Sequence, residues 1–259
     1  MILHANETGS GAAVAVLHGL FGAGRNLGLL QRRLAGEFRV LALDLRNHGA
    51  SPHATEMSYK AMAADVAETL AARGALPAAL LGHSMGGKVA MLLALDRPAA
   101  VRALVVADIA PVPYPPHHRG LLAAMQALRL VPGLSRRAAD AALAGPVPDA
   151  AVRGFLLQNL ISGDTPSWRI GLAEIAASMP ALEDFPALPR ARYEGPVLFV
   201  SGGRSNYLRP EHHATIRTSF PAARFATLAG SGHWLHADDP KGFLGLIVPF
   251  LEAVTAAAP

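Results

Sequence analysis

Short runs of apolar and β-branched residues recur along the chain, and each is followed by a longer segment in which apolar residues repeat at helical spacing. Strands that are buried on both faces of a parallel sheet consist of such near-continuous apolar runs. The alternation therefore predicts an α/β fold with a mostly parallel central sheet flanked by helices. We expect strands at Ala12–Leu17, Arg39–Leu43, Ala78–Leu81, Ala103–Ala107, Val197–Val200 and Arg224–Leu228, and helices at Leu27–Leu34, Tyr59–Arg73, Met85–Leu95 and His212–Ser219.

The alternation stops between Pro111 and Arg192, where strand patterns vanish and prolines separate segments of helical character. We interpret residues 111–190 as a helical cap inserted into an α/β core made of residues 1–110 and 191–259. A last helix is expected at Lys241–Val254, with a kink or an early end at Pro249. The predicted cap helices are Gly120–Leu130, Arg136–Leu143, Ala150–Leu160 and Ser167–Ala177.

The composition narrows the class of protein. The 259 residues are enough for one α/β domain with a modest lid. No apolar run approaches the roughly 18 residues that span a bilayer, and Met1–Gly11 lacks the features of a signal peptide, so we expect a cytoplasmic protein without a membrane span. The absence of cysteine excludes disulfides, thiolate metal sites and a cysteine nucleophile. The 23 basic and 19 acidic residues are scattered, which argues against nucleic-acid binding; the oligomeric state is left open.

The strongest chemical signal is Gly82-His83-Ser84-Met85-Gly86-Gly87, which follows a predicted strand and begins a predicted helix. This is the setting of a nucleophile elbow, in which a sharp turn forces the central serine into a strained backbone conformation. Flanking glycines are required because a side chain there would clash. We therefore expect Ser84 to be the nucleophile, exposed at the carboxyl end of the sheet.

A serine hydroxyl needs a general base, and the base needs an acid that orients it. His233 lies late in the chain on a Gly-rich loop after the last predicted strand, which matches the order serine, acid, histidine of α/β-hydrolases. The acid often follows the preceding strand, but residues 202–207 contain no carboxylate. Asp108, directly after the strand that ends at Ala107, is our candidate acid, against the alternative that it only caps the cap segment. Glu211 and Asp238 are weaker substitutes.

An oxyanion hole needs two backbone N–H groups aimed at the developing charge. One should belong to Met85, and the other to the loop after the first buried strand, at Leu20 or Phe21. The same loop begins a dinucleotide fingerprint, but Leu27 occupies the position of the third glycine, so we expect no cofactor. We also expect no metal site, because the paired histidines at residues 117–118 and 212–213 cannot share a helical face.

The chain resembles the YbfF-type esterases, a bacterial branch of the α/β-hydrolases with relatives in mitochondria. The resemblance implies a nucleophile at Ser84, an acid at Asp108, a base at His233 and a supporting polar role for Ser205 near that histidine. It also implies action on esters, and acyl-CoA thioesters are associated with the group. The matching motifs lie at residues 17–22, 44–49, 51–53, 82–91, 108–111, 155–157, 159–160, 168–169, 205, 207, 232–234 and 236–237.

We therefore expect a serine carboxylesterase for small to medium acyl esters, with acyl thioesters as an extension. A basic cap surface could attract an anionic acyl carrier, although a solvated face is the simpler interpretation. This surface consists of His117, His118, Arg119, Arg129, Arg136 and Arg137. Carbon-carbon bond hydrolases and perhydrolases use the same three residues, and a non-catalytic ligand receptor has less reason to keep them together. Phe155, Trp168 and Met179 could line an acyl pocket, but packing within the cap is favoured.

Overall fold

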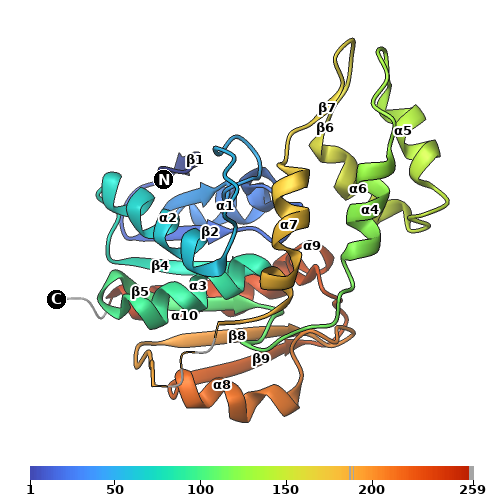
Figure 1. The fold of residues 1–259 in the computed structure, drawn as a ribbon. Helices are drawn as coiled ribbons and strands as arrows, with labels where there is room; N and C mark the ends of the chain where they lie inside the picture. The colour runs from blue at the N-terminus through green and yellow to red at the C-terminus, as the bar shows by residue number, and fades with distance from the viewer. Residues whose placement is uncertain (187, 189, 257–259) are drawn as a thin grey trace.

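A mostly parallel sheet forms the centre of the computed structural model, which describes residues 1–186, 188 and 190–256 (Figure 1). Seven strands lie in the order β1-β3-β2-β4-β5-β8-β9, and all neighbours are parallel except β1, which runs antiparallel to β3. This confirms the predicted α/β-hydrolase architecture, with β1 as an edge strand that the sequence analysis missed. The strands are β1 (Ala5–Thr8), β2 (Ala13–Leu17), β3 (Arg39–Leu43), β4 (Ala78–His83), β5 (Val101–Ala107), β8 (Val197–Gly202) and β9 (Ala223–Leu228).

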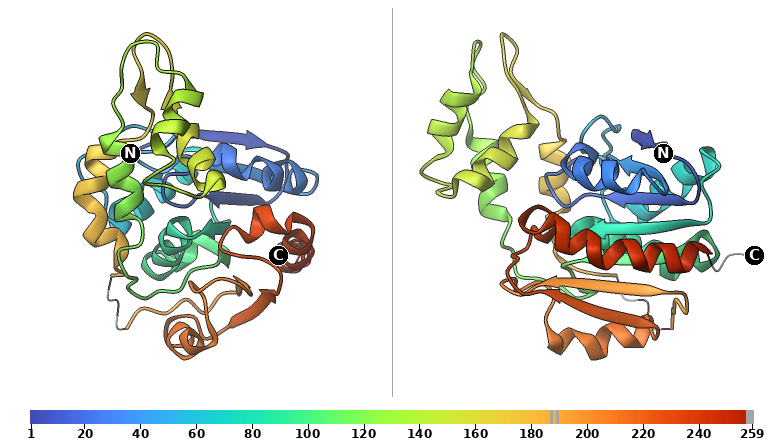
Figure 2. Two further views of the ribbon diagram at one scale, coloured as in Figure 1. Left: turned by 90° about the vertical axis from the view of Figure 1, so that its right-hand side faces the viewer. Right: turned by 180° about the vertical axis from the view of Figure 1, so that it is seen from behind.

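Helices cover both faces of this sheet, and alternate residues of each inner strand point to opposite faces (Figure 2). In β2, for example, Ala15 and Leu17 join one apolar core while Val14 and Val16 join the other. Because both faces are buried, these strands need apolar residues at every position, which explains the continuous runs in the sequence. The first core includes residues of α2 (Tyr59–Ala72), α3 (Met85–Asp96) and α8 (His213–Ser219), and the second includes residues of α1 (Gly28–Leu34), α9 (Leu235–Asp238) and α10 (Pro240–Ala256).

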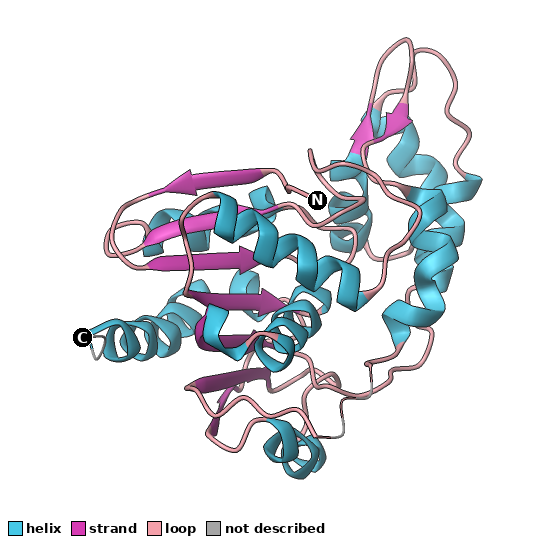
Figure 3. Cartoon of the chain, turned by 60° about the vertical axis from the view of Figure 1, so that its left-hand side comes forward, coloured by secondary structure: helices cyan, strands magenta, loops and turns pink. Residues whose placement is uncertain are grey.

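The chain between β5 and β8 forms a separate group of helices, which we call the helical insertion and define as residues Arg119–Glu183. The parallel strands point toward it, so it lies beside their carboxyl ends (Figure 3). The division of the chain into a core and a cap at residues 111 and 190 stays a prediction. The insertion comprises α4 (Arg119–Ala127), α5 (Arg136–Leu143), α6 (Ala150–Leu156), η3 (Leu157–Asn159), β6 (Leu160–Ile161), β7 (Ser167–Trp168) and α7 (Leu172–Glu183).

Several predicted helices have different bounds in the structure. The helix predicted at Gly120–Leu130, for example, runs from Arg119 to Ala127. The helix expected at Ser167–Ala177 is wrong at its start, because Ser167 and Trp168 pair with β6 as a strand and α7 begins only at Leu172. The helix expected at Ala150–Leu160 ends at Leu156 and continues as η3 and β6.

The last helix does not have the early end that we gave as one of two alternatives at Pro249, because α10 runs on to Ala256. The kink stays a prediction. Proline removes one backbone hydrogen bond from a helix, while Ile247 and Leu251 on either side of it are completely buried against the sheet and hold the helix in place.

Short one-turn elements complete the described chain: η1 (Gly24–Leu27), η2 (Pro98–Ala100) and η4 (Pro210–His212). In the part of the chain that the structure describes, every helix is too short or too polar to cross a membrane.

Candidate active site

Ser84 occupies the sharp turn between β4 and α3. Its backbone has φ 52° and ψ −118°, and its N–H donates to Ala107 O of the neighbouring strand at 3.0 Å. A Cβ on Gly82 would lie 2.3 Å from Gly86 O, and one on Gly86 would lie 2.4 Å from Leu17 O, so only glycine fits at these two positions. The turn thus holds the Ser84 hydroxyl at the amino terminus of α3, with 8% of the residue exposed.

His233 lies on the loop after β9 and reaches both other members of the candidate triad. Its Nε2 is 3.1 Å from Ser84 Oγ, and its Nδ1 is 2.7 Å from Asp108 Oδ2. Two neighbours fix the histidine further: His83 Nε2 donates to the carbonyl oxygen of His233 at 2.8 Å, and the ring of Tyr207 stacks on the imidazole with 4.0 Å between centroids. The sequence analysis gave Tyr207 no role, although it is part of the matching motifs.

Asp108 is completely buried directly after β5 and has a positive φ of 53°. Its Oδ1 accepts from the N–H of Gly202 at 3.1 Å, and its Oδ2 accepts from Ser205 Oγ as well as contacting His233. The side chain therefore does not cap a helix of the insertion. Ser205 therefore contacts the carboxylate of Asp108 rather than the imidazole of His233. It lies in the segment of residues 202–207, where the acid of this fold is often found.

The two substitute acids have partners elsewhere. Asp238 Oδ2 accepts from the N–H of Gly232, and Glu211 contacts Arg209 at 3.2 Å. In the described residues, Asp108 is thus the carboxylate that the structure places on His233.

The loop after β2 passes close to Ser84, since a Cβ on Gly19 would lie 3.3 Å from Ser84 Cβ. The two candidate oxyanion donors of this loop differ. The Phe21 N–H already donates to His48 Nε2 at 3.1 Å, whereas within the described residues no acceptor is bonded to the Leu20 amide. Met85 begins α3, so its N–H has no acceptor within the helix. The geometry therefore favours Leu20 over Phe21.

His48 is a site residue that the sequence analysis passed over inside the matching motif at residues 44–49. It is completely buried, its Nδ1 donates to Arg46 O at 2.9 Å, and its Nε2 accepts from Phe21. Burial lowers the pKa of His48 to about 3. The ring is therefore neutral at physiological pH and keeps the lone pair that holds the oxyanion loop.

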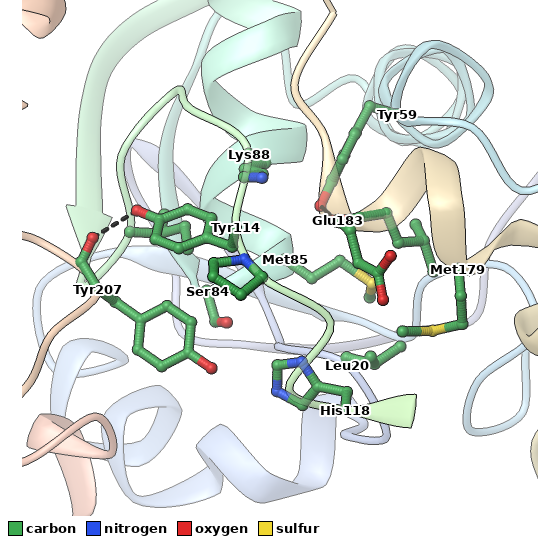
Figure 4. Close-up of a pocket in the computed structure, with 13 residues that line it drawn as sticks. Leu20, Tyr59, Ser84, Met85, Lys88, Tyr114, His118, Met179, Glu183 and Tyr207 are labelled. Carbon is green, nitrogen blue, oxygen red and sulfur yellow. Dashed lines mark hydrogen bonds between the residues drawn. The ribbon is translucent and has the colours of Figure 1, made fainter. Parts of the chain in front are cut away.

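Ser84 lies between two pockets. The first, of about 450 Å³, has apolar walls from the core and from α7 and also contains Lys88 (Figure 4). The second, of about 650 Å³, includes His233, Trp234 and Phe155. Met179 lines the first pocket and Phe155 the second, so two of the three cap residues considered face the site, whereas Trp168 lines neither of these pockets.

His118 lies on the segment that leads into α4 and lines both pockets. Burial, and then the nearby His233, lower the pKa of His118 to about 4, so it is uncharged at neutral pH. Two arginines of the proposed basic cap surface are engaged: Arg119 forms an ion pair with Glu183 at 2.5 Å, and Arg136 donates to Leu157 O at 3.1 Å.

The structure combines a sheet of this topology with a serine at the strand-to-helix turn, a histidine in contact with that serine and a buried aspartate in contact with the histidine. This combination defines a serine hydrolase. Residues 12–240 match the family model described as alpha/beta hydrolase fold, and the chain belongs to that family.

The relatives give the family more detail. The sn-1-specific diacylglycerol lipase ABHD11 of Mus musculus is 44% identical, over 92% of this chain and 80% of the relative. Esterase YbfF of Escherichia coli (strain K12) is 35% identical over 92% of both chains, which confirms the resemblance to the YbfF-type esterases. A solved structure titled marine microorganism esterase superposes with a TM-score of 0.93 at 32% identity, covering 96% of this chain and 99% of that one.

Proposed function

We propose that this protein is a serine carboxylesterase that hydrolyses esters through an acyl-enzyme on Ser84. The observation that carries the proposal is the continuous chain of contacts from Ser84 Oγ to His233 Nε2 and from His233 Nδ1 to Asp108 Oδ2, at 3.1 and 2.7 Å. These contacts lie within or near hydrogen-bond distance, so a proton can pass from the serine hydroxyl to the imidazole as the hydroxyl attacks.

The reaction then has two halves. In the first, His233 Nε2 takes the proton of Ser84, the Ser84 oxygen bonds to the ester carbonyl carbon, and the oxyanion accepts from the amides of Leu20 and Met85. His233 returns the proton to the alcohol oxygen as the carbon–oxygen bond breaks. In the second half, His233 deprotonates a water that attacks the acyl carbon, and the same proton passes from His233 to Ser84 Oγ as the bond between Oγ and the acyl carbon breaks and the free acid leaves.

The two pockets receive different halves of the ester in this proposal. The departing alcohol oxygen must lie beside His233 to be protonated, and His233 lines the second pocket but not the first. The alcohol therefore occupies the second pocket, between Trp234 and Phe155. The acyl group occupies the first, where Met85, Ile109, Met179 and Leu182 form the apolar surface.

Asp108 stays ionised during both halves and stabilises the imidazolium that forms. The two further donors that it accepts from, Gly202 N–H and Ser205 Oγ, hold the carboxylate in place. Ser205 thus acts through Asp108. The substrates in this proposal are small to medium acyl esters, with thioesters as an extension of the same acyl chemistry.

The test combines turnover with active-site labelling. A series of 4-nitrophenyl esters of increasing acyl length, run beside acyl-CoA thioesters, should show turnover by the wild-type protein, and a fluorophosphonate probe should label Ser84. Ser84→Ala should lower kcat on the order of a millionfold and abolish labelling. Ser10→Ala, at an exposed loop residue, is the matched control and should leave both unchanged. A wild-type protein that neither turns over esters nor reacts with the probe would refute the proposal and favour a receptor.

A further inference from the structure

Lys88 is a buried amine that the proposed mechanism does not use. It lies in α3, four residues after Ser84, and only 2% of it is exposed. A lysine is almost never buried to this extent without a carboxylate or another strong partner, because removing the ammonium group from water is costly. The position of Lys88 therefore calls for an explanation.

The partners that the structure gives Lys88 are weak ones for an ammonium group. Its Nζ donates to the backbone oxygen of Asp184 at 2.7 Å and lies 4.8 Å from the ring centre of Tyr114 and 5.5 Å from that of Tyr59. The carboxylate of Asp184 does not pair with it and accepts from the Phe185 N–H instead. An ammonium group can donate three hydrogen bonds. Among the described residues, Lys88 Nζ has a single hydrogen-bond acceptor, Asp184 O.

The amine forms part of the wall of the first pocket, which it shares with Ser84, and Figure 4 shows it between the rings of Tyr59 and Tyr114. Three of the other polar groups here are already bonded. The hydroxyl of Tyr59 donates to Leu182 O, that of Tyr114 donates to Tyr207 O, and the carboxylate of Glu183 pairs with Arg119. Lys88 is thus a cationic donor with remaining capacity at the edge of the acyl pocket, which His118 and Tyr207 also line.

We propose that Lys88 donates a hydrogen bond to a neutral oxygen, such as a ketone, hydroxyl or amide oxygen, carried by the acyl group of the substrate. Lys88 is then a specificity-determining residue that selects oxygen-bearing acyl groups over hydrocarbon chains of equal length. The inference rests on the proposed function, because it places the acyl group in the first pocket.

Two features define the substrate class. Lys88 follows Ser84 by four residues, about one helical turn, and both residues line the first pocket, so the oxygen lies a few bonds beyond the ester carbonyl carbon. A neutral oxygen fits better than a carboxylate, because the Glu183 carboxylate lines the same pocket and would repel a second negative charge.

The test compares two esters of equal chain length, 4-nitrophenyl hexanoate and 4-nitrophenyl 5-oxohexanoate. The wild-type protein should have a kcat/KM about tenfold higher for the oxo ester, the factor typical of a hydrogen bond from a charged donor. Lys88→Met introduces a side chain of similar length without a hydrogen-bond donor, and it should bring the ratio of the two kcat/KM values to one or below. Lys60→Met, at an exposed lysine of α2, is the matched control and should keep the wild-type ratio.

A second readout needs no variant and covers the case in which Lys88→Met does not fold. Burial lowers the pKa of Lys88 to about 8, so the ratio for the wild-type protein should fall as pH rises from 6.5 to 9.5. The titration of the triad does not affect this ratio, because both esters are hydrolysed by the same triad. The other ionisable groups of this pocket with shifted pKa values do not mimic the effect: burial raises the pKa of Tyr59, Tyr114 and Tyr207 and lowers that of His118 to about 4. The Glu183 carboxylate is paired with Arg119.

Three results would overturn the proposal: a wild-type ratio near one, a ratio that Lys88→Met leaves unchanged, or a preference for the 4-carboxybutanoate ester over the oxo ester, which would assign an anionic group instead. Failure of the proposed function gives a different result, because then neither ester is hydrolysed and the fluorophosphonate probe does not label Ser84.

Discussion

The carboxyl edge of the sheet and the helical insertion face each other across Ser84, but they are held together by different means. At the sheet edge, Ser84 and Asp108 follow adjacent strands, both have positive φ, and the N–H of each donates to a neighbouring strand at 3.0 and 2.9 Å. The insertion is attached mainly through side chains: Asn159 donates to Phe21 O at 2.7 Å and Tyr59 donates to Leu182 O at 2.8 Å, beside the backbone hydrogen bond from Gly171 N–H to Asn47 O at 2.9 Å.

This difference in attachment suggests that the sheet edge serves catalysis and the insertion serves substrate selectivity. Backbone geometry within a sheet is rigid, which suits groups that must stay aligned for every substrate. Side-chain contacts can change without disturbing the fold, which suits the walls that recognise the acyl group and the alcohol. Changes at the sheet edge should therefore lower kcat for all esters, whereas changes in the insertion should affect some esters more than others.

After Ser84→Ala, the largest expected effect comes from Asp108→Asn. The substitution keeps the shape of the side chain but removes the charge that stabilises the imidazolium, and it favours the wrong tautomer of His233. We expect kcat to fall on the order of ten thousandfold, by the same factor for short and long acyl esters. Steady-state kinetics on the ester series measures this. A loss below tenfold would remove Asp108 from the triad.

Gly86→Ala should produce the next largest effect, on stability. The new Cβ would lie 2.4 Å from Leu17 O of β2, so either α3 or the strand must move, at a cost of about 2–3 kcal/mol. Urea denaturation measures the change. Gly120→Ala in α4 of the insertion is the matched control: no atom lies within 4 Å of its Cβ, and we expect it to stabilise the protein by about 0.5–1 kcal/mol. Equal changes in the unfolding free energy for Gly86→Ala and Gly120→Ala would contradict the proposed difference between the sheet edge and the insertion.

A smaller effect concerns acid stability at His48. Burial lowers the pKa of His48 in the folded protein to about 3, below the ordinary value of 6.5, so the unfolded chain binds more protons between these two pH values. The contribution of His48 is complete above pH 6.5 and decreases as the pH falls toward 3. His48→Gln should make the pH dependence of the unfolding free energy shallower by about 1.4 kcal/mol per pH unit in that window. His4→Gln, at an exposed residue, should leave the slope unchanged.

The smallest expected effect lies in the insertion. Met179→Ala removes part of the acyl wall, so KM should rise a few fold for hexanoate and octanoate esters and stay constant for acetate. Phe155→Ala, on the alcohol side, is the companion variant and should instead alter the preference between leaving alcohols. An equal loss of kcat for every ester in Met179→Ala would contradict a purely selective role.

Much of the sheet edge could be predicted from the sequence. Buried strands are recognisable by their continuous apolar runs, and polar residues directly after parallel strands meet at one edge, which is why the sequence placed Ser84, Asp108 and His233 near each other. Their catalytic roles stay a proposal. The edge strand β1 was missed because its residues are only half buried or exposed and show no apolar run.

The insertion was harder to predict because its elements depend on tertiary packing rather than on local pattern. Ser167 and Trp168 have no strand signal until β6 lies beside them. His48, Tyr207 and Lys88 were given no role for a similar reason. Histidine, tyrosine and lysine are common on surfaces, and only the fold shows that these three surround the triad and its acyl pocket.

The position of Ser84 between two separate pockets has a consequence for the fate of the acyl-enzyme. Under the proposed mechanism the alcohol leaves the second pocket while the acid is still covalently attached beside the first. The emptied space is shaped for an alcohol, so an added alcohol competes there with water for the bound acid. Ester exchange should then accompany hydrolysis, in a proportion that depends on how much alcohol the medium contains and on how well it fits between Trp234 and Phe155.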